Sequence, residues 1–177
     1  MRPRRASLLG ALALLTLTVA LAVFGQQGED PDRAKQKQTI TDIRNVGSAM
    51  YFWFQSEMLP KRSDEAHEKA KAESDAKSVD IAAVPVISRE ELAKLLVPKY
   101  LPAIPQQDGW GHPYEFRFNT ANPSAVRMMG VRSAGRDGRF SGTVYEVGAF
   151  DPPEYDQDIA WMDGYFMRWP QRKEQKN

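Results

Sequence analysis

Apolar residues recur at steps of three and four between Arg33 and Met58, the period of an amphipathic α-helix. The stripe consists of Ile40, Ile43, Val46, Gly47, Met50 and Phe54. The positions between them are mostly polar or charged, so we expect this one face to pack on the rest of the domain. The glycine on the stripe predicts close approach of another element. Leu59-Pro60 then ends the helix, because a residue before proline disfavours helical geometry.

The last turns of this helix are apolar on nearly every side, because Tyr51, Phe52, Trp53 and Phe54 follow one another. Such an end is either buried by several elements of its own chain or covered by a partner subunit. The sequence leaves both alternatives open.

A period of two follows later in the chain, where Tyr114, Phe116 and Phe118 alternate with charged residues. This pattern predicts a half-buried strand. The strand is preceded by a turn signal, Asp108-Gly109, and by Pro113, which can open a strand but cannot occupy its centre. We therefore expect the chain to turn, to place the indole of Trp110 at a corner, and to enter a sheet.

Shorter patterns complete the fold. Ser88-Arg-Glu-Glu91 is a capping box before a short helix with an apolar face at Leu92, Leu95 and Leu96. The next antiparallel strand is predicted at 126–131, and a short strand at 144–147. Residues 61–80 are charged and carry few large apolar side chains, which indicates a solvated helix or a mobile insertion. The predicted fold class is α+β: a long N-terminal helix packed on a small antiparallel β-sheet, with C-terminal loops.

The N-terminus has a different character. Arg2, Arg4 and Arg5 precede an apolar run of 17 residues from Leu8 to Phe24. A bilayer needs about 17–25 such residues, so the run is either an uncleaved membrane anchor or a cleaved secretion signal, and both place the remainder outside the cytoplasm. We expect an anchor or signal segment at 1–30, a domain at 31–170 with a charged insertion at 61–80, and a polar tail at 171–177.

Composition narrows the function. The net charge of +1 argues against nucleic-acid binding. The chain has no cysteine, which excludes disulfides, thiol nucleophiles and thiolate metal sites. His67 lies in the charged tract, where we expect an exposed residue without function, and His112 follows a turn. The sequence shows neither a glycine-rich phosphate loop nor a histidine pair at metal spacing. We therefore expect no enzyme, no catalytic residue and no small-molecule substrate.

Acidic residues gather in two C-terminal loops. One loop is Ser133–Arg139, where glycines flank Asp137, and the other holds Asp156 and Asp158. Hard cations take several carboxylate and carbonyl oxygens, so these acids form a cation site if the loops meet, and are solvated loop acids if they do not. The spacing differs from the EF-hand pattern.

The order of these features resembles the major pseudopilin of the type II secretion system, its G subunit. The resemblance covers about 33–58 and 88–161. It is carried by the segments Arg33–Arg44, Tyr100–Pro105, Asp-Gly-Trp-Gly-His-Pro-Tyr at 108–114, Ser-Ala-Gly-Arg-Asp-Gly at 133–138, and Asp156–Ile159. It implies a pilin-like fold anchored in the inner membrane and assembly in the bacterial periplasm. The implied partners are other secretion-system or pseudopilus subunits, including copies of the chain itself.

The resemblance also implies a bound calcium ion. Carried over to this sequence, the side-chain oxygens come from Asp137, Asp158 and Asp156. Backbone oxygens come from near Ala134 and Arg139.

One family feature is missing from the sequence. The prepilin signal has a glycine before Phe-Thr-Leu and a glutamate five residues in, whereas here the order is Phe24-Gly25-Gln26, and Gly25 to Pro31 interrupts the helix. Two functions therefore remain. The first is a non-enzymatic pseudopilin-like protein that assembles in the periplasm, and the alternative is a free exported interaction module that reuses the fold.

Overall fold

The computed structural model describes residues 30–73 and 76–171. The chain divides into two compact units, Met1–Pro31 and Asp32–Asn177, and the fold below is that of the second. The predicted anchor or signal at 1–30 and the tail at 171–177 lie almost wholly outside the described residues. Among the described helices, none has both the length and the hydropathy to cross a bilayer.

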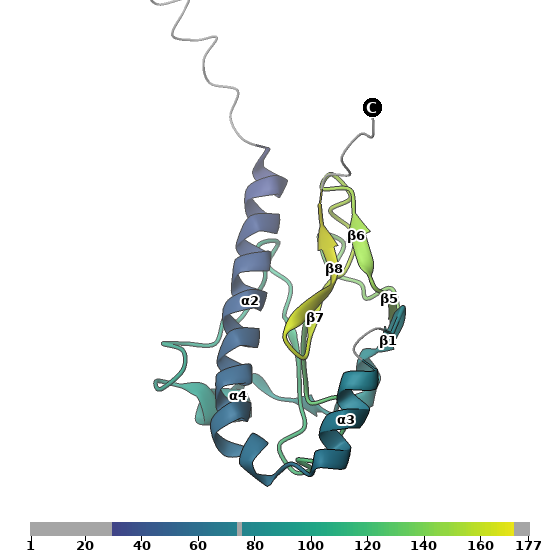
Figure 1. Cartoon of the computed structure of the whole chain (residues 1–177). Helices are drawn as coiled ribbons and strands as arrows, with labels where there is room; N and C mark the ends of the chain where they lie inside the picture. The colour runs from purple at the N-terminus through teal and green to yellow at the C-terminus, as the bar shows by residue number, and fades with distance from the viewer. Residues whose placement is uncertain (1–29, 74–75, 172–177) are drawn as a thin grey trace, which may run out of the picture. The chain divides into compact units, whose positions relative to one another are not determined.

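The long helix α2 (Pro31–Glu57) confirms the helix predicted from the apolar stripe (Figure 1). Ile43, Val46 and Met50 are completely buried. A 3-10 turn, η1 (Leu59–Lys61), ends the helix where Pro60 was expected to stop it. Gly47 also behaves as predicted, because the indole of Trp161 lies directly against it.

A six-stranded sheet packs beside this helix. Its order is β2 (Val86–Ile87), β3 (Glu115–Phe118), β4 (Met129–Ser133), β7 (Ile159–Met162), β8 (Tyr165–Pro170) and β6 (Gly148–Phe150). The pairs are antiparallel except β6 with β8. That pair is parallel because the chain reverses twice between the two strands. The α+β class of a long helix on a sheet is confirmed, and the parallel edge is an addition to the predicted antiparallel sheet.

The charged tract forms more structure than its composition indicated. The helix α3 (Asp64–Ala72) is capped by Ser63 and largely exposed, in agreement with a solvated helix. The tract then ends in β1 (Ser78–Asp80), which pairs with β5 (Val144–Glu146) and leads into η2 (Ile81–Ala83). Val79 is buried there. A single apolar residue between Ser78 and Asp80 was too weak a signal to predict this pairing.

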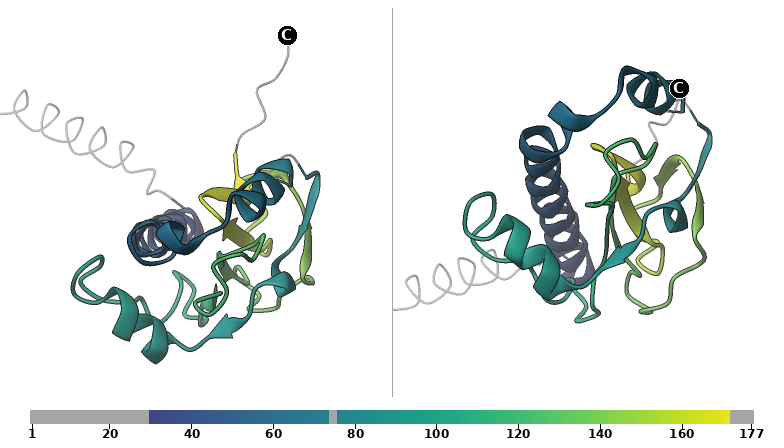
Figure 2. Two further views of the ribbon diagram at one scale, coloured as in Figure 1. Left: turned by 60° about the horizontal axis from the view of Figure 1, so that its bottom comes forward. Right: turned by 90° about the horizontal axis from the view of Figure 1, so that it is seen from below.

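The short helix α4 (Arg89–Leu96) has both arms of the predicted capping box, from Ser88 and Glu91. Leu92 and Leu96 are completely buried. Helices α4 and α3 lie on opposite sides of the C-terminal end of α2 (Figures 1 and 2).

The main core joins the stripe of α2 to the sheet. Ile43, Met50 and Phe54 belong to the same buried cluster as Tyr114 and Phe116. Burying one such side chain stabilises the folded state by about 1.5–3 kcal/mol, so this contact between the helix and the sheet dominates the packing.

Candidate functional site

The indole of Trp110 forms a corner on the N-terminal half of α2. Its Nε1 donates a hydrogen bond to Asp32 Oδ1 at 3.0 Å. The preceding N–H, of Gly109, donates to Thr39 Oγ1 at 3.0 Å. A Cβ atom on Gly109 would collide with the backbone of Lys35. Residue 109 must therefore be glycine for the corner to reach the helix.

Asp108 connects this corner to the loop at 133–139. Its Oδ1 accepts the N–H groups of Trp110 and His112, at 3.0 and 2.9 Å. Its Oδ2 accepts the hydroxyl of Ser133 at 2.6 Å, and that hydroxyl oxygen accepts the N–H of Gly135. Two of the segments that carry the resemblance, at 108–114 and 133–138, therefore meet in space.

The loop at 133–139 folds back on itself, as its glycines predicted. Gly135 and Gly138 have φ angles of +68° and +69°, a region that other residues rarely adopt. A side chain on Gly135 would collide with the carbonyl oxygens of Tyr155 and Gln157, while the N–H of Arg136 donates to Tyr155 O at 2.8 Å. The two acidic loops are thus in contact.

Arg136 forms an ion pair with Asp156, one of the predicted metal ligands. Its guanidinium donates two hydrogen bonds to Asp156, at 2.8 and 2.9 Å, and lies 3.4 Å from Asp32 Oδ2. These hydrogen bonds hold the pKa of Asp156 below its usual value. In this arrangement Asp156 forms an ion pair with Arg136 through both carboxylate oxygens.

Asp158 is the buried acid of the site, only 2% exposed. Its Oδ2 accepts three hydrogen bonds: the N–H and hydroxyl of Ser141, at 3.0 and 2.8 Å, and the phenol of Tyr145, at 2.7 Å. Burial and the charge of Asp158 raise the pKa of Tyr145. Its Oδ1 is buried and has no hydrogen-bond partner within residues 30–73 and 76–171. A buried acceptor without a partner requires an explanation.

The five residues predicted to hold calcium are therefore only partly brought together. Ala134 and Asp158 are buried, whereas Asp137, Asp156 and Arg139 are exposed. Asp137 closes its own turn by accepting the N–H of Arg139 at 2.9 Å. In the described part of the chain, no three acidic, histidine or cysteine residues converge to hold a metal. The free oxygen of Asp158 fits a cation ligand, and calcium binding stays a prediction.

A network of charged side chains next to Tyr145, which binds Asp158, was not predicted from the sequence. Glu115 accepts hydrogen bonds from Arg132, at 3.0 Å to each oxygen, and from Arg117. Arg132 also donates to the phenol of Tyr145 at 2.8 Å, which leads to Asp158. The alternation along β3 predicted a solvated face for these charges. That face is instead covered, since Arg117 donates to the carbonyl of Val84, just after η2.

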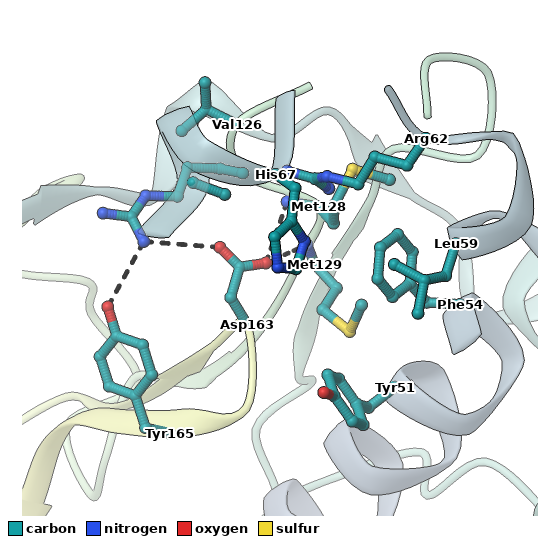
Figure 3. A pocket seen from close by; sticks show the side chains of 12 residues that line it. Tyr51, Phe54, Leu59, Arg62, His67, Val126, Met128, Met129, Asp163 and Tyr165 are labelled. Atoms are coloured by element: carbon teal, nitrogen blue, oxygen red, sulfur yellow. Dashed lines mark hydrogen bonds and ion pairs between the residues drawn. The ribbon is translucent and has the colours of Figure 1, made fainter. Parts of the chain in front are cut away.

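A hollow of about 250 Å³ opens at the other end of α2 (Figure 3). Its walls come from α2, η1, α3, β4 and the turn between β7 and β8. His67 is exposed, as predicted, and lies at this hollow. The turn residue Asp163 was not singled out from the sequence. The signal was present, because Asp163-Gly164 between two apolar runs is a typical hairpin turn.

A shallow groove continues from this hollow along α2. It shares Tyr51, Asp163 and Tyr165 with the hollow and adds Phe52 and Phe166. Phe52 is 58% exposed and Tyr51 40%, whereas Phe54 is buried and Trp53 packs edge-on against Phe118 with the ring centroids 5.0 Å apart. The aromatic end of the helix is therefore half core and half surface.

Comparisons with protein-family models, with curated proteins and with solved structures gave no match.

Proposed function

We propose that this chain is a non-enzymatic, pseudopilin-like protein of type II secretion that acts by protein–protein assembly in the periplasm. The observation that supports this most is the contact between the segments of Asp108 and Ser133 beside α2. The hydrogen bond between Ser133 and Asp108 links the segments at 108–114 and 133–138, two of those that resemble the family, and Trp110 attaches them to Asp32. Two motifs that follow one another in the family's order and are also joined in space are stronger support than either motif alone.

The proposed mode of action is contact with other proteins. Phe52 and Tyr51 leave an aromatic surface on α2 beside the groove. Exposed apolar patches on soluble proteins mark interaction sites. The proposed partners are secretion-system or pseudopilus subunits, and the proposed location is the periplasmic side of the inner membrane.

Calcium binding is part of the proposal. The ion would be held by Asp158, through the oxygen that lacks a partner, by backbone oxygens near Ala134 and Arg139, and by the side chains of Asp137 and Asp156. Asp156 would first have to leave Arg136. A divalent cation placed there would fix the two loops to each other through oxygen ligands.

Fractionation and chemical crosslinking in the native cell test the proposal. We expect the full chain in the membrane fraction, crosslinked to secretion-system subunits. Absence of both membrane association and contact with those subunits would overturn it.

The alternative is a free exported interaction module, which the missing prepilin motif favours. Sequencing the mature N-terminus separates the two functions. A start near Val23 or Gln26 would indicate an ordinary signal peptidase and a soluble product, whereas an uncleaved apolar run would indicate an anchored protein.

A further inference from the structure

The helix α3, named here together with Glu73 as the strap, buries little of its own surface. Of the nine residues of the helix only Ala66 is buried, and Ala70 is half-buried. Figure 1 shows the strap crossing from the C-terminal end of α2 toward β1. An isolated helix in water needs about 12–15 residues to be even marginally stable. The helix α3 is shorter than that, so it stays helical only while it is attached to the rest of the domain.

The N-terminal end of the strap is capped mainly by its own neighbours. The hydroxyl oxygen of Ser63 accepts the N–H of Ala66 at 3.2 Å. The Nη2 atom of Arg62 donates to the carbonyl of Ala66 at 2.9 Å, and its guanidinium lies 5.8 Å from the ring centroid of Phe54 in α2. The two hydrogen bonds join residues 62–66 to one another, so they cap the strap without fixing it to the sheet.

Arg127 attaches the other end of the strap to the sheet. Its Nη2 donates to the carbonyl oxygen of Glu73 at 2.8 Å, and its Nε lies 3.8 Å from the carboxylate of the same residue. Arg127 belongs to the segment just before β4, and its side chain is only 9% exposed. A hydrogen bond from a charged donor is stronger than one between neutral groups, so this contact is the main polar attachment of Glu73.

Arg127 is itself held on the sheet side. Its Nη1 lies 3.6 Å from Asp163 Oδ2 and 3.4 Å from the hydroxyl of Tyr165. Asp163 is fixed in turn, because its Oδ1 accepts the N–H groups of Met128 and Met129 at 2.9 and 3.0 Å. The guanidinium therefore stays with the sheet when Glu73 leaves it.

The strap forms one wall of the hollow at the C-terminal end of α2. His67 and Ala70 of α3 line the same hollow as Met128 and Met129 (Figure 3). The two methionines are only 3% and 1% exposed. If α3 leaves, this wall leaves with it, and water reaches the methionines.

We propose that the strap detaches from the domain as a unit while α2 and the six-stranded sheet stay folded, and that Arg127 is the latch that keeps it attached. Segments with few buried contacts open at a free energy well below that of global unfolding. The moving part is bounded by Met58, which is buried, and by Lys77, whose carbonyl accepts the N–H of Val147 at 2.9 Å. The motion needs neither a partner nor secretion machinery, so it stands independently of the proposed function.

Hydrogen exchange on the unmodified full-length chain tests the opening. We expect the helical amides of α3 to exchange roughly a hundredfold faster than those of α2 between Ile43 and Phe54. Protection of α3 equal to that of α2 would show that both open only by global unfolding, and would overturn the proposal.

Thiol labelling tests whether the opening uncovers the sheet. The chain has no cysteine, so a single introduced thiol reports its own position. Met128→Cys places the thiol in the hollow, and Val131→Cys is the control, since Val131 is completely buried and lies outside the lining. We expect the thiol at position 128 to react roughly tenfold faster or more, because local opening is easier than global unfolding. Equal rates at the two positions would contradict the detachment.

Two arginine variants test the latch. Arg127→Met keeps a long side chain and removes the donor to Glu73, so labelling at position 128 should rise roughly tenfold while labelling at position 131 stays the same. The control is Arg168→Met, at a half-buried arginine of β8 that donates to Gly148 and Gln157, which should leave position 128 unchanged. No rise at position 128, or an equal rise at both positions, would exclude Arg127 as the latch.

Discussion

Gly47 keeps α2 close to the sheet because it has no side chain. A Cβ atom there would lie 2.7–2.9 Å from ring atoms of Trp161, closer than such contacts allow. We predict that Gly47→Ala destabilises the protein by about 1–3 kcal/mol, although alanine is the better helix former by about 1 kcal/mol. Chemical denaturation measures this change. The control is Ser48→Ala, at an exposed neighbour, and a Gly47→Ala protein as stable as that control would contradict the close contact.

Glu115 makes stability depend on pH. Burial raises its pKa, but the hydrogen bonds from Arg132 and Arg117 outweigh burial, so the pKa lies below the usual 4.5. A carboxylate with a lowered folded-state pKa contributes stability above its unfolded value, and this contribution is lost as the pH falls through the folded-state pKa. Between about pH 5 and pH 3, the unmodified protein should therefore lose more free energy of unfolding than Glu115→Gln does.

Glu115→Gln is also expected to lower the free energy of unfolding at neutral pH. Arg132 is only 4% exposed, and removing one partner of a buried ion pair costs roughly 3 kcal/mol. Urea denaturation at several pH values measures both effects, with Glu146→Gln, an exposed carboxylate, as the control. Identical pH profiles for the unmodified protein and Glu115→Gln would show that the ion pairs of Glu115 are not the source of the pH dependence of stability.

Asp158 is the residue at which calcium binding is tested. We predict that calcium raises the melting temperature of the chelated protein, by an amount equivalent to about 2.7 kcal/mol at a hundred times the dissociation constant. Asp158→Asn should abolish the rise, whereas Asp151→Asn, at an exposed position in the same loop, should retain it. No shift at millimolar calcium would mean that these acids serve only to join the loops.

At the scale of the elements, the corner at Trp110 decides how the sheet meets α2. A methyl group at Gly109 would strike the backbone of Lys35, which cannot move without unwinding the helix. We predict that Gly109→Ala costs roughly 3 kcal/mol, at the upper end for overpacking, because the corner must leave the helix. Gly148→Ala is the control, since a Cβ atom there meets nothing within 4 Å. Equal unfolding free energies for the two variants would show that the corner is not docked.

The elements that could be predicted from the sequence are those whose signals are local. The stripe of α2, the capping box at Ser88 and the alternation along β3 all depend on neighbours within a few residues. The parallel pairing of β6 with β8 and the pairing of β1 with β5 depend on contacts between distant segments. Short strands of three residues carry no periodicity from which such pairing can be predicted.

The candidate sites also contain features with local sequence signals and features that depend on contacts between distant segments. The glycines predicted that the loop at 133–139 folds its backbone back, as Gly135 and Gly138 do, but the sequence left open whether this loop meets the loop of Asp156 and Asp158. The burial of Arg132 and Arg117 was not expected, because the pattern of β3 and β4 does not reveal that η2 covers their second face. The hollow at the C-terminal end of α2 is lined by residues of both α3 and β4, so no single stretch of sequence indicates it.

For the molecule as a whole, the proposed function requires that other proteins contact the exposed aromatic side chains Tyr51 and Phe52 on α2. A photo-crosslinking amino acid at Phe52 in the native cell tests it most directly, with the same group at Ala82, an exposed position on η2 outside the groove, as the control. We predict crosslinks to secretion-system or pseudopilus subunits from position 52 and none from position 82. No crosslinked protein from position 52, or the same products from both positions, would contradict it.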